Sequence, residues 1–215
     1  MAKSLNEFQQ AKEALYKHGV IAFPTETVMG LGVLYNDRIA YDKLNEIKRR
    51  PEDKPYTLMV KDVNDISEYA LIDECTQRVI DAFMPGSITI LVPVKRDAVP
   101  EYVTHGTGII GIRVPENKEA LEVLKEAKLP LLVPSANRSG EKPALSDKEV
   151  KEIFGDEVDY VVSGQAKLAK PSTIVSLVNG EVKVLREGPI SEEKILKIYN
   201  KYIEIWTIFN KVNKY

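Results

Sequence analysis

The sequence predicts an α/β protein with a twisted, open sheet of mixed parallel and antiparallel strands and flanking helices. Two observations carry this prediction. Segments with helical spacing of apolar residues alternate with short apolar runs up to about residue 162. The dipeptide Asn179-Gly180, a strong hairpin signal, then joins two further apolar runs. A hairpin brings antiparallel pairing into a sheet that helix-strand alternation alone would make parallel.

The first half of the chain is expected to begin and end its helices at local capping and turn signals. In order, the elements are a helix from the capping-box pair Ser4 and Glu7 to Gly19, a strand over 20–23, a helix over 38–49, a strand over 57–60, and two short helices within 62–84 that stop at Pro85-Gly86.

The second half is expected to contain more strands than helices. In order, they are strands over 87–94 and 109–114, a helix over 117–127, a strand over 131–134, a short helix that Ser146 and Glu149 cap and that ends near Gly155, strands over 160–162 and 174–178, and a returning strand over 182–185.

The C-terminal segment has a different pattern. Apolar residues recur at alternating spacings of three and four, a heptad-like seam on one helix from about 191 to 213: Ile195, Ile198, Tyr202, Ile205, Phe209 and Val212. We therefore divide the chain into a domain over 1–190 and a helical extension over 191–215. The extension either docks on its own domain or binds a second copy or a partner, so both a monomer and a dimer fit the sequence.

Composition indicates one globular domain without an obvious polyanion-binding surface. The 215 residues are 44% hydrophobic, and the net charge is only −2. The single cysteine, Cys75, excludes an internal disulfide and agrees with a reducing compartment. No apolar run approaches the roughly 20 residues that a membrane span requires. We expect a cytoplasmic protein that does not contact membranes.

Four predicted strands end in small polar or cationic residues. Their ends are Phe23 to Thr27, Gly111 to Pro115, Pro134 to Gly140, and Pro171 to Val175. Ligands of open α/β sheets bind at such strand ends. The candidate side chains are Thr25, Thr27, Ser135, Asn137, Ser172 and Thr173. Each of them can also simply close a turn or cap a helix.

The candidate cations lie in three segments. Lys48, Arg50 and Lys54 follow one another at the end of the second helix, where they either bind an anion or complement the helix dipole as a solvated end. Arg113 lies inside a strand and Arg186 ends another. Such cations need an anionic partner, which is either a substrate or an internal Glu or Asp.

Familiar nucleotide and nucleophile motifs are absent. The sequence has no GxxxxGK[ST] or GxSxG pattern. Its GxGxxG match, Gly106 to Gly111, leads into the predicted strand over 109–114, whereas a dinucleotide-binding fingerprint opens a helix. Glu26 is the only acid inside a ligand-like loop. A site rich in cations and hydroxyls but poor in bases fits a highly anionic substrate, on which positioning and charge stabilisation supply most of the rate, as in attack on phosphorus.

Taken together, the motifs resemble the YrdC/YciO superfamily in order and over roughly residues 5 to 190. The matching pieces are Pro24 to Gly32, Lys48-x-Arg50-Pro51, Pro85 to Leu91, Gly111 to Pro115, Pro134 to Gly140, Pro171 to Val175, and Leu185 to Gly188.

The resemblance implies the family's mixed sheet with a concave cationic cavity. It also implies threonylcarbamoyl-AMP synthase activity, in which L-threonine, bicarbonate or CO2, and ATP give threonylcarbamoyl-adenylate and pyrophosphate. That product feeds the threonylcarbamoyl modification of tRNA adenosine, so a downstream threonylcarbamoyl-transferase complex is an implied partner.

The resemblance also assigns roles to residues. Lys48, Arg50 and Lys54 would hold the triphosphate, with Lys48 and Arg50 as the catalytic pair, and Mg2+ would be bound mainly through the phosphates. The threonine carboxylate would pair with Arg113. The remaining roles are threonine orientation by Thr25 or Thr27, Ser135 and Ser172, and nucleotide contacts by Asn137, Ser146 and Arg186.

Two positions depart from the synthase pattern. Met29 stands where synthases often have Tyr, and Met59 stands where they often have His. The run Tyr56 to Val60 is closer to the YciO branch. Two alternatives therefore accompany the synthase: a YciO-like relative with another nucleotide substrate, and a module whose cationic cavity binds double-stranded RNA or tRNA.

Overall fold

The computed structural model describes residues 5–49 and 55–200. Strands within these residues are β1 (Ile21–Phe23), β2 (Gly30–Leu34), β3 (Thr57–Met59), β4 (Ile88–Pro93), β5 (Ile109–Arg113), β6 (Leu131–Leu132), β7 (Tyr160–Val161), β8 (Thr173–Ser176) and β9 (Lys183–Arg186). Helices are α1 (Leu5–Leu15), α2 (Arg38–Lys48), α3 (Ile66–Tyr69), α4 (Glu74–Phe83), α5 (Glu101–Thr104), α6 (Lys118–Ala127) and α7 (Asp147–Phe154).

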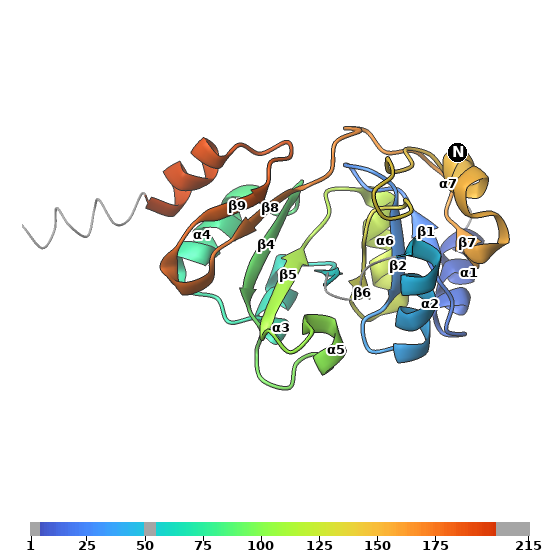
Figure 1. The fold of residues 1–215 in the computed structure, drawn as a ribbon, viewed down its shortest axis with the longest axis horizontal. Helices are drawn as coiled ribbons and strands as arrows, with labels where there is room; N and C mark the ends of the chain where they lie inside the picture. Colours follow the sequence, from blue (N-terminus) through green and yellow to red (C-terminus); the bar gives the residue numbers. More distant parts are fainter. Residues whose placement is uncertain (1–4, 50–54, 201–215) are drawn as a thin grey trace, which may run out of the picture.

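The strands form one sheet in the order β7-β1-β2-β6-β3-β5-β4-β8-β9 (Figure 1). Three neighbouring pairs are parallel, namely β1 with β7, β3 with β5, and β4 with β8. The other pairs are antiparallel. The predicted mixed, open α/β sheet with flanking helices is confirmed.

Local signals set most helix boundaries. The side chains of Asp37, Asp73 and Asn117 accept backbone N–H bonds in the first turns of α2, α4 and α6. The predicted hairpin turn is also present, because Asn179 and Gly180 both have positive φ between β8 and β9. The predicted capping residue Ser4 lies outside the described residues.

β2 is a strand that no sequence pattern predicted, and it pairs with β1 and β6. Its run Gly30-Leu31-Gly32-Val33-Leu34 contains two glycines, which normally weaken a strand. The structure supplies the reason for Gly32, since a Cβ there would lie 2.7 Å from Cε1 of Phe23. Close packing of the buried Phe23 ring against the β2 backbone requires a residue without a side chain.

Each strand sends alternate residues to two cores, one on each face of the sheet. Ile21 and Phe23 of β1 pack with α1 and α6, in a cluster that also contains Leu15, Val123 and Leu124. Figure 1 shows α1 and α6 beside β1 and β7. The intervening Ala22 belongs to the core on the opposite face, which α2, α4 and α7 help to build.

The C-terminal segment docks on its own domain as far as the structure describes it. Residues 192–200 are helical, and Ile195 and Tyr199 are buried in the core that contains α4. Burial raises the pKa of Tyr199, and so do the charges of Asp73 and Cys75. The rest of the predicted helix, including Tyr202, lies outside the described residues. In the described parts of the chain, no helix combines the length and hydrophobicity that crossing a bilayer requires.

Candidate functional site

One face of the sheet changes character from one half to the other. Over β1, β2 and β6 it is covered by α1 and α6, and we call this the covered half. Over β3, β5, β4 and β8 the same face lines a cavity, and we call this the open half. Met59 joins the two halves, because it packs in the α1–α6 core and also lines the cavity.

Strand register explains how polar groups reach the open half. Met59 pairs with Leu131 on one side and with Arg113 on the other. Because Ile90 pairs with Ile112, the next side chains on the opposite face are Thr89 and Arg113. Thr89 pairs with Ile174, and Ile174 with Arg186. One row across six strands therefore passes from apolar residues under the helices to two arginines in the open half.

The cavity encloses about 600 Å³, including space that is open to solvent. It is lined by residues from all four segments that the sequence analysis selected, together with residues of β3, β4 and β9. Its lining includes Thr27, Val28, Thr57, Met59, Thr89, Arg113, Val133, Ser135, Ser172, Ile174 and Arg186.

The turn after β1 is fixed by its own hydroxyls. Thr25 Oγ1 donates to the carbonyl of Val28 at 2.7 Å and accepts from the backbone N–H groups of Thr27 and Val28. It also lies 2.8 Å from Thr27 Oγ1. Thr25 is buried behind the turn, whereas Thr27 lines the cavity. Thr25 therefore holds the turn that presents Thr27.

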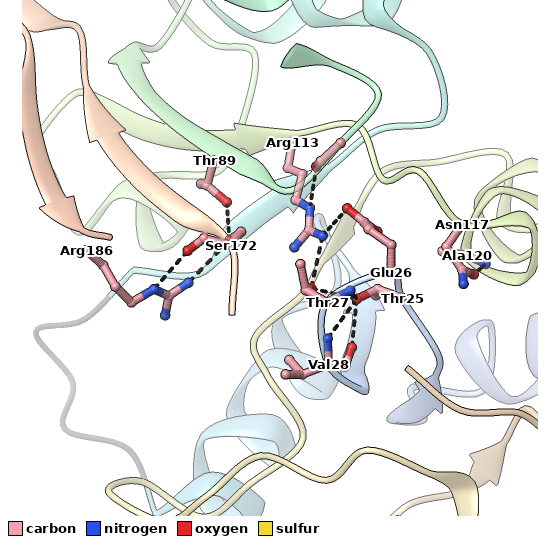
Figure 2. A network of polar contacts seen from close by, with 11 residues as sticks. Thr25, Glu26, Thr27, Val28, Thr89, Arg113, Asn117, Ala120, Ser172 and Arg186 are labelled. Atoms are coloured by element: carbon pink, nitrogen blue, oxygen red, sulfur yellow. Dashed lines mark hydrogen bonds and ion pairs between the residues drawn. The ribbon is translucent and has the colours of Figure 1, made fainter. Parts of the chain in front are cut away.

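Arg113 reaches from β5 to this turn (Figure 2). Its Nε donates to the carbonyl of Gly86 at 3.2 Å, and its Nη2 donates to Glu26 Oε1 at 2.5 Å and to Thr27 Oγ1 at 3.0 Å. Both Arg113 and Glu26 are buried, with 6% and 5% exposure. An internal carboxylate is thus the partner of Arg113, which was one of the two alternatives expected from the sequence.

Arg186 enters the cavity from β9 without an acidic partner among the described residues. It donates to the backbone carbonyl of Ser172 at 3.0 Å and to Ser172 Oγ at 3.2 Å. Ser172 Oγ also lies 3.1 Å from Thr89 Oγ1, as Figure 2 shows. Desolvation lowers the pKa of Arg186, and the positive charge of Arg113 lowers it further. An anion in the cavity would relieve this repulsion.

Lys48 holds the loop that follows β6. Its side chain is buried, and Nζ donates to the carbonyls of Ser135 and Asn137 at 2.6 and 2.8 Å. The backbone carbonyl of Lys48 accepts from Ser139 N–H at 2.9 Å. Burial excludes the solvated helix end that was the simpler interpretation of Lys48. The end of α2 and the Ser135–Asn137 loop are joined into one unit.

Asn137 stabilises the same loop through hydrogen bonds to other residues of the loop. Its Oδ1 accepts from Ser135 Oγ at 2.6 Å, and its Nδ2 donates to the carbonyls of Arg138 and Glu141. Both amide hydrogens are therefore used inside the loop. Ser135 lies in front of Asn137 and lines the cavity.

The structure brings together five of the predicted site residues around one cavity: Thr27, Arg113, Ser135, Ser172 and Arg186. Three others, Thr25, Lys48 and Asn137, lie behind this lining and support it. Ser146 does not line the cavity, and its Oγ accepts from Glu149 N–H and caps α7. Arg50 and Lys54 lie outside the described residues.

Sequence reasoning missed three polar residues of the site. Thr57 and Thr89 line the cavity, and Glu26 pairs with Arg113. Alternation was the available signal for the threonines, since each occupies a position of its strand where the neighbouring residue faces the core. Glu26 was noticed as an acid in a ligand-like loop, but its partner is 87 residues away in sequence.

The described residues contain no group of three His, Cys, Asp or Glu side chains that could hold a metal ion. In this part of the chain, the polar side chains that line the cavity are chiefly guanidinium and hydroxyl groups. Such groups bind anionic oxygens by charge and hydrogen bonding.

Fold and cavity together define a class: an α/β domain that forms a polar ligand site on an uncovered stretch of its single mixed sheet. The Sua5/YciO/YrdC family model, described as "Telomere recombination", matches residues 13–188. The chain belongs to this family.

Two curated relatives illustrate the similarity. A putative threonylcarbamoyl-AMP synthase of Methanocaldococcus jannaschii is 33% identical over 189 residues, which cover 86% of this chain and 87% of the relative. A threonylcarbamoyl-AMP synthase of Bacillus subtilis is 32% identical over 191 residues, which cover 88% of this chain. The chain spans only 55% of that second relative.

Two solved structures share the fold. P. abyssi Sua5 complexed with L-threonine superposes with a TM-score of 0.84 at 29% identity, covering 89% of this chain and 56% of Sua5. E. coli YciO superposes with a TM-score of 0.83 at 28% identity, covering 90% of this chain and 94% of YciO.

Proposed function

We propose that this protein is a threonylcarbamoyl-AMP synthase, a nucleotidyltransferase that forms threonylcarbamoyl-adenylate and pyrophosphate from L-threonine, bicarbonate or CO2, and ATP. The observation that carries the proposal is the convergence of Arg113, Arg186 and five Ser and Thr hydroxyls on one cavity of a family member. The relatives named as synthases and the threonine complex of Sua5 support it.

The cavity suits an amino acid with a carboxylate and a hydroxyl group. Two of the three guanidinium nitrogens of Arg113 are occupied by protein oxygens, while Nη1 has no hydrogen bond within the described residues. In the proposal, Nη1 donates to the threonine carboxylate. The hydroxyls of Thr27, Ser135 and Ser172 orient the rest of the amino acid.

The chemistry requires one nucleophilic step on phosphorus. The neutral threonine amine adds to CO2 and loses a proton, which gives a carbamate. A carbamate oxygen then attacks the α-phosphorus of ATP, a P–O bond forms, and the bond to pyrophosphate breaks. Among the described residues, no carboxylate forms an ion pair with Arg186. Its positive charge can therefore stabilise phosphate oxygens in this step.

Several assignments belong to the proposal without a geometric test. Arg50 and Lys54 would bind the triphosphate together with Lys48, whose ammonium already supports the Ser135 loop. Asn137 would act through that loop, and Ser146 would contact the nucleotide. Mg2+ would be held mainly by the phosphates and would neutralise their charge. RNA binding and a downstream transferase complex remain predictions.

Pyrophosphate release tests the proposal directly. With ATP, Mg2+ and bicarbonate, we expect release that depends on L-threonine, together with a product of the mass of threonylcarbamoyl-adenylate. Arg186→Ala should raise the KM for ATP by about tenfold, since it removes a charged hydrogen-bond donor. Arg96→Ala is the matched control, because Arg96 is almost fully exposed and lies outside the cavity lining.

A YciO-like activity on another nucleotide substrate is the second candidate. It is favoured by the YciO superposition, which covers nearly the full length of both chains. The same assay separates the candidates: pyrophosphate or phosphate release that ignores L-threonine would reject the synthase and favour this alternative.

A further inference from the structure

The buried carboxylate of Glu26 lies beside the cavity without lining it. Its side chain is 6% exposed and that of Arg113 is 7% exposed, so the pair is almost fully removed from solvent. The turn that carries Glu26 is fixed by the Thr25 hydroxyl, and the Glu26 carbonyl accepts from Leu168 N–H at 3.0 Å. Glu26 is therefore held in place, and its carboxylate binds the Arg113 guanidinium through an ion pair.

The guanidinium has few orientations left. A guanidinium is planar, so fixing two of its nitrogens fixes the third. Gly86 holds Nε, and Glu26 with Thr27 uses both hydrogens of Nη2. The remaining nitrogen, Nη1, has no hydrogen bond within the described residues and is not sealed from solvent. The contacts of Nε with Gly86, and of Nη2 with Glu26 and Thr27, therefore set the direction of the two Nη1 N–H groups.

The ion pair also sets the charge of this end of the cavity. Glu26 cancels the charge of Arg113 locally, whereas Arg186 has no described carboxylate beside it. Arg113 can therefore act as a directional donor, and the net attraction for anions comes from Arg186. Glu26 Oε2 is buried and has no hydrogen-bond partner in the described structure, so a neutral amide in its place would break no second contact.

Resting on the proposed function, we propose that Glu26 is a positioning residue for substrate recognition: by holding Arg113 Nη2, it orients Nη1 toward the carboxylate of the amino-acid substrate. Orientation by the Glu26 oxygen, and not the negative charge of Glu26, is the essential contribution. Glu26→Gln keeps an acceptor oxygen and should preserve recognition, whereas Glu26→Ala should lose it.

The orientation can be measured without substrate. In protein labelled with ¹⁵N-arginine, the Arg113 signals are identified by their loss in Arg113→Lys. We expect separate Nη1 and Nη2 signals in the native protein and in Glu26→Gln, because the contacts to Nη2 restrict rotation of the guanidinium. In Glu26→Ala the two signals should merge. Separate signals that persist in Glu26→Ala would overturn the positioning role.

Binding then tests the consequence for recognition. By calorimetry, Glu26→Ala should weaken L-threonine binding about tenfold or more, as misplacement of a binding group does, and should change ATP affinity less than about twofold. Glu26→Gln should stay within about threefold of the native affinity for L-threonine. Equal losses for L-threonine and ATP would indicate a general structural role, and a Glu26→Gln loss as large as that of Glu26→Ala would indicate a charge effect; both results reject the inference.

Two further results keep this test separate from the proposed function. If the native protein binds no L-threonine while its Arg113 signals behave as expected, the proposed function fails and the positioning of Arg113 by Glu26 stands. If Glu26→Ala does not fold, Thr27→Val replaces it in the spectroscopic test, because it removes one of the two acceptors of Nη2. Unchanged Arg113 signals in that variant and in Glu26→Gln support Glu26 as the dominant acceptor, and merged signals in Thr27→Val overturn that assignment.

Discussion

The covered half and the open half lie on one face of the same hydrogen-bonded sheet. Their side chains differ in role: those of the covered half form a core, and those of the open half line a cavity. In the covered half, Ile21, Phe23 and Leu131 are fully buried against α1 and α6. In the open half, the equivalent side chains are Arg113, Thr89 and Ile174, which line a cavity. The site therefore arises where the covering helices end while the sheet continues.

The largest expected effect is on the free energy of unfolding, and it distinguishes two isoleucines on this face. Ile21→Ala in the covered half should lower the free energy of unfolding by about 2–5 kcal/mol, because it leaves a cavity in a closed core. Ile174→Ala in the open half should cost less than about 1 kcal/mol, since its side chain is already partly exposed. Urea unfolding measures both, and similar losses would show that the open half is packed as tightly as the covered half.

Adding a methyl group at two glycines, one in each half, tests the same difference in packing. A Cβ at Gly32 would lie 2.7 Å from the Phe23 ring, whereas a Cβ at Gly111 would meet Leu91 Cδ2 at 3.0 Å and Thr89 Cγ2 at 3.3 Å. Gly32→Ala should therefore destabilise by about 1–3 kcal/mol. Gly111→Ala should change stability by less than about 1 kcal/mol, because its neighbours are side-chain ends that can move into the cavity.

Thermal unfolding of the two glycine variants, compared with the native protein, provides the measurement. A large loss of stability for Gly111→Ala, with none for Gly32→Ala, would contradict the assignment of open and covered halves.

The smallest effect concerns the opposite face, where Tyr102 is partly buried against the core that contains α2. Burial raises the pKa of Tyr102 to about 12, with a smaller contribution from Asp37. An unfolded tyrosine has a pKa of about 10. The folded state therefore binds more protons between pH 10 and 12, and this contribution to stability is complete below pH 10 and is lost as the pH rises toward 12.

Urea unfolding of the native protein and Tyr102→Phe at pH 9 and pH 11 tests this expectation. The native protein should lose more stability over this interval, by less than about 1 kcal/mol because the tyrosine is partly exposed. Identical pH dependence in the two proteins would indicate that the Tyr102 hydroxyl is hydrated in the folded state.

Much of the fold could be predicted because its signals are local. The helices α2, α4 and α6 begin at side-chain caps and carry one apolar face, and the β8–β9 connection has its Asn-Gly turn. β2 could not be predicted in the same way, because its Gly32 is required by a phenylalanine in the neighbouring strand. The five residues now found around the cavity were candidates because they lie in or next to predicted strands, near a strand end.

By itself, the sequence determined which segments become helices and strands and which polar side chains stand at strand ends, since capping, periodicity and turn chemistry act over a few residues. Tertiary packing alone determines that Arg113 pairs with Glu26, that Lys48 supports the Ser135 loop, and that Ser146 is not among the residues that line the cavity. Those outcomes depend on strand order and register, which bring together residues far apart in the chain, and no local pattern specifies them.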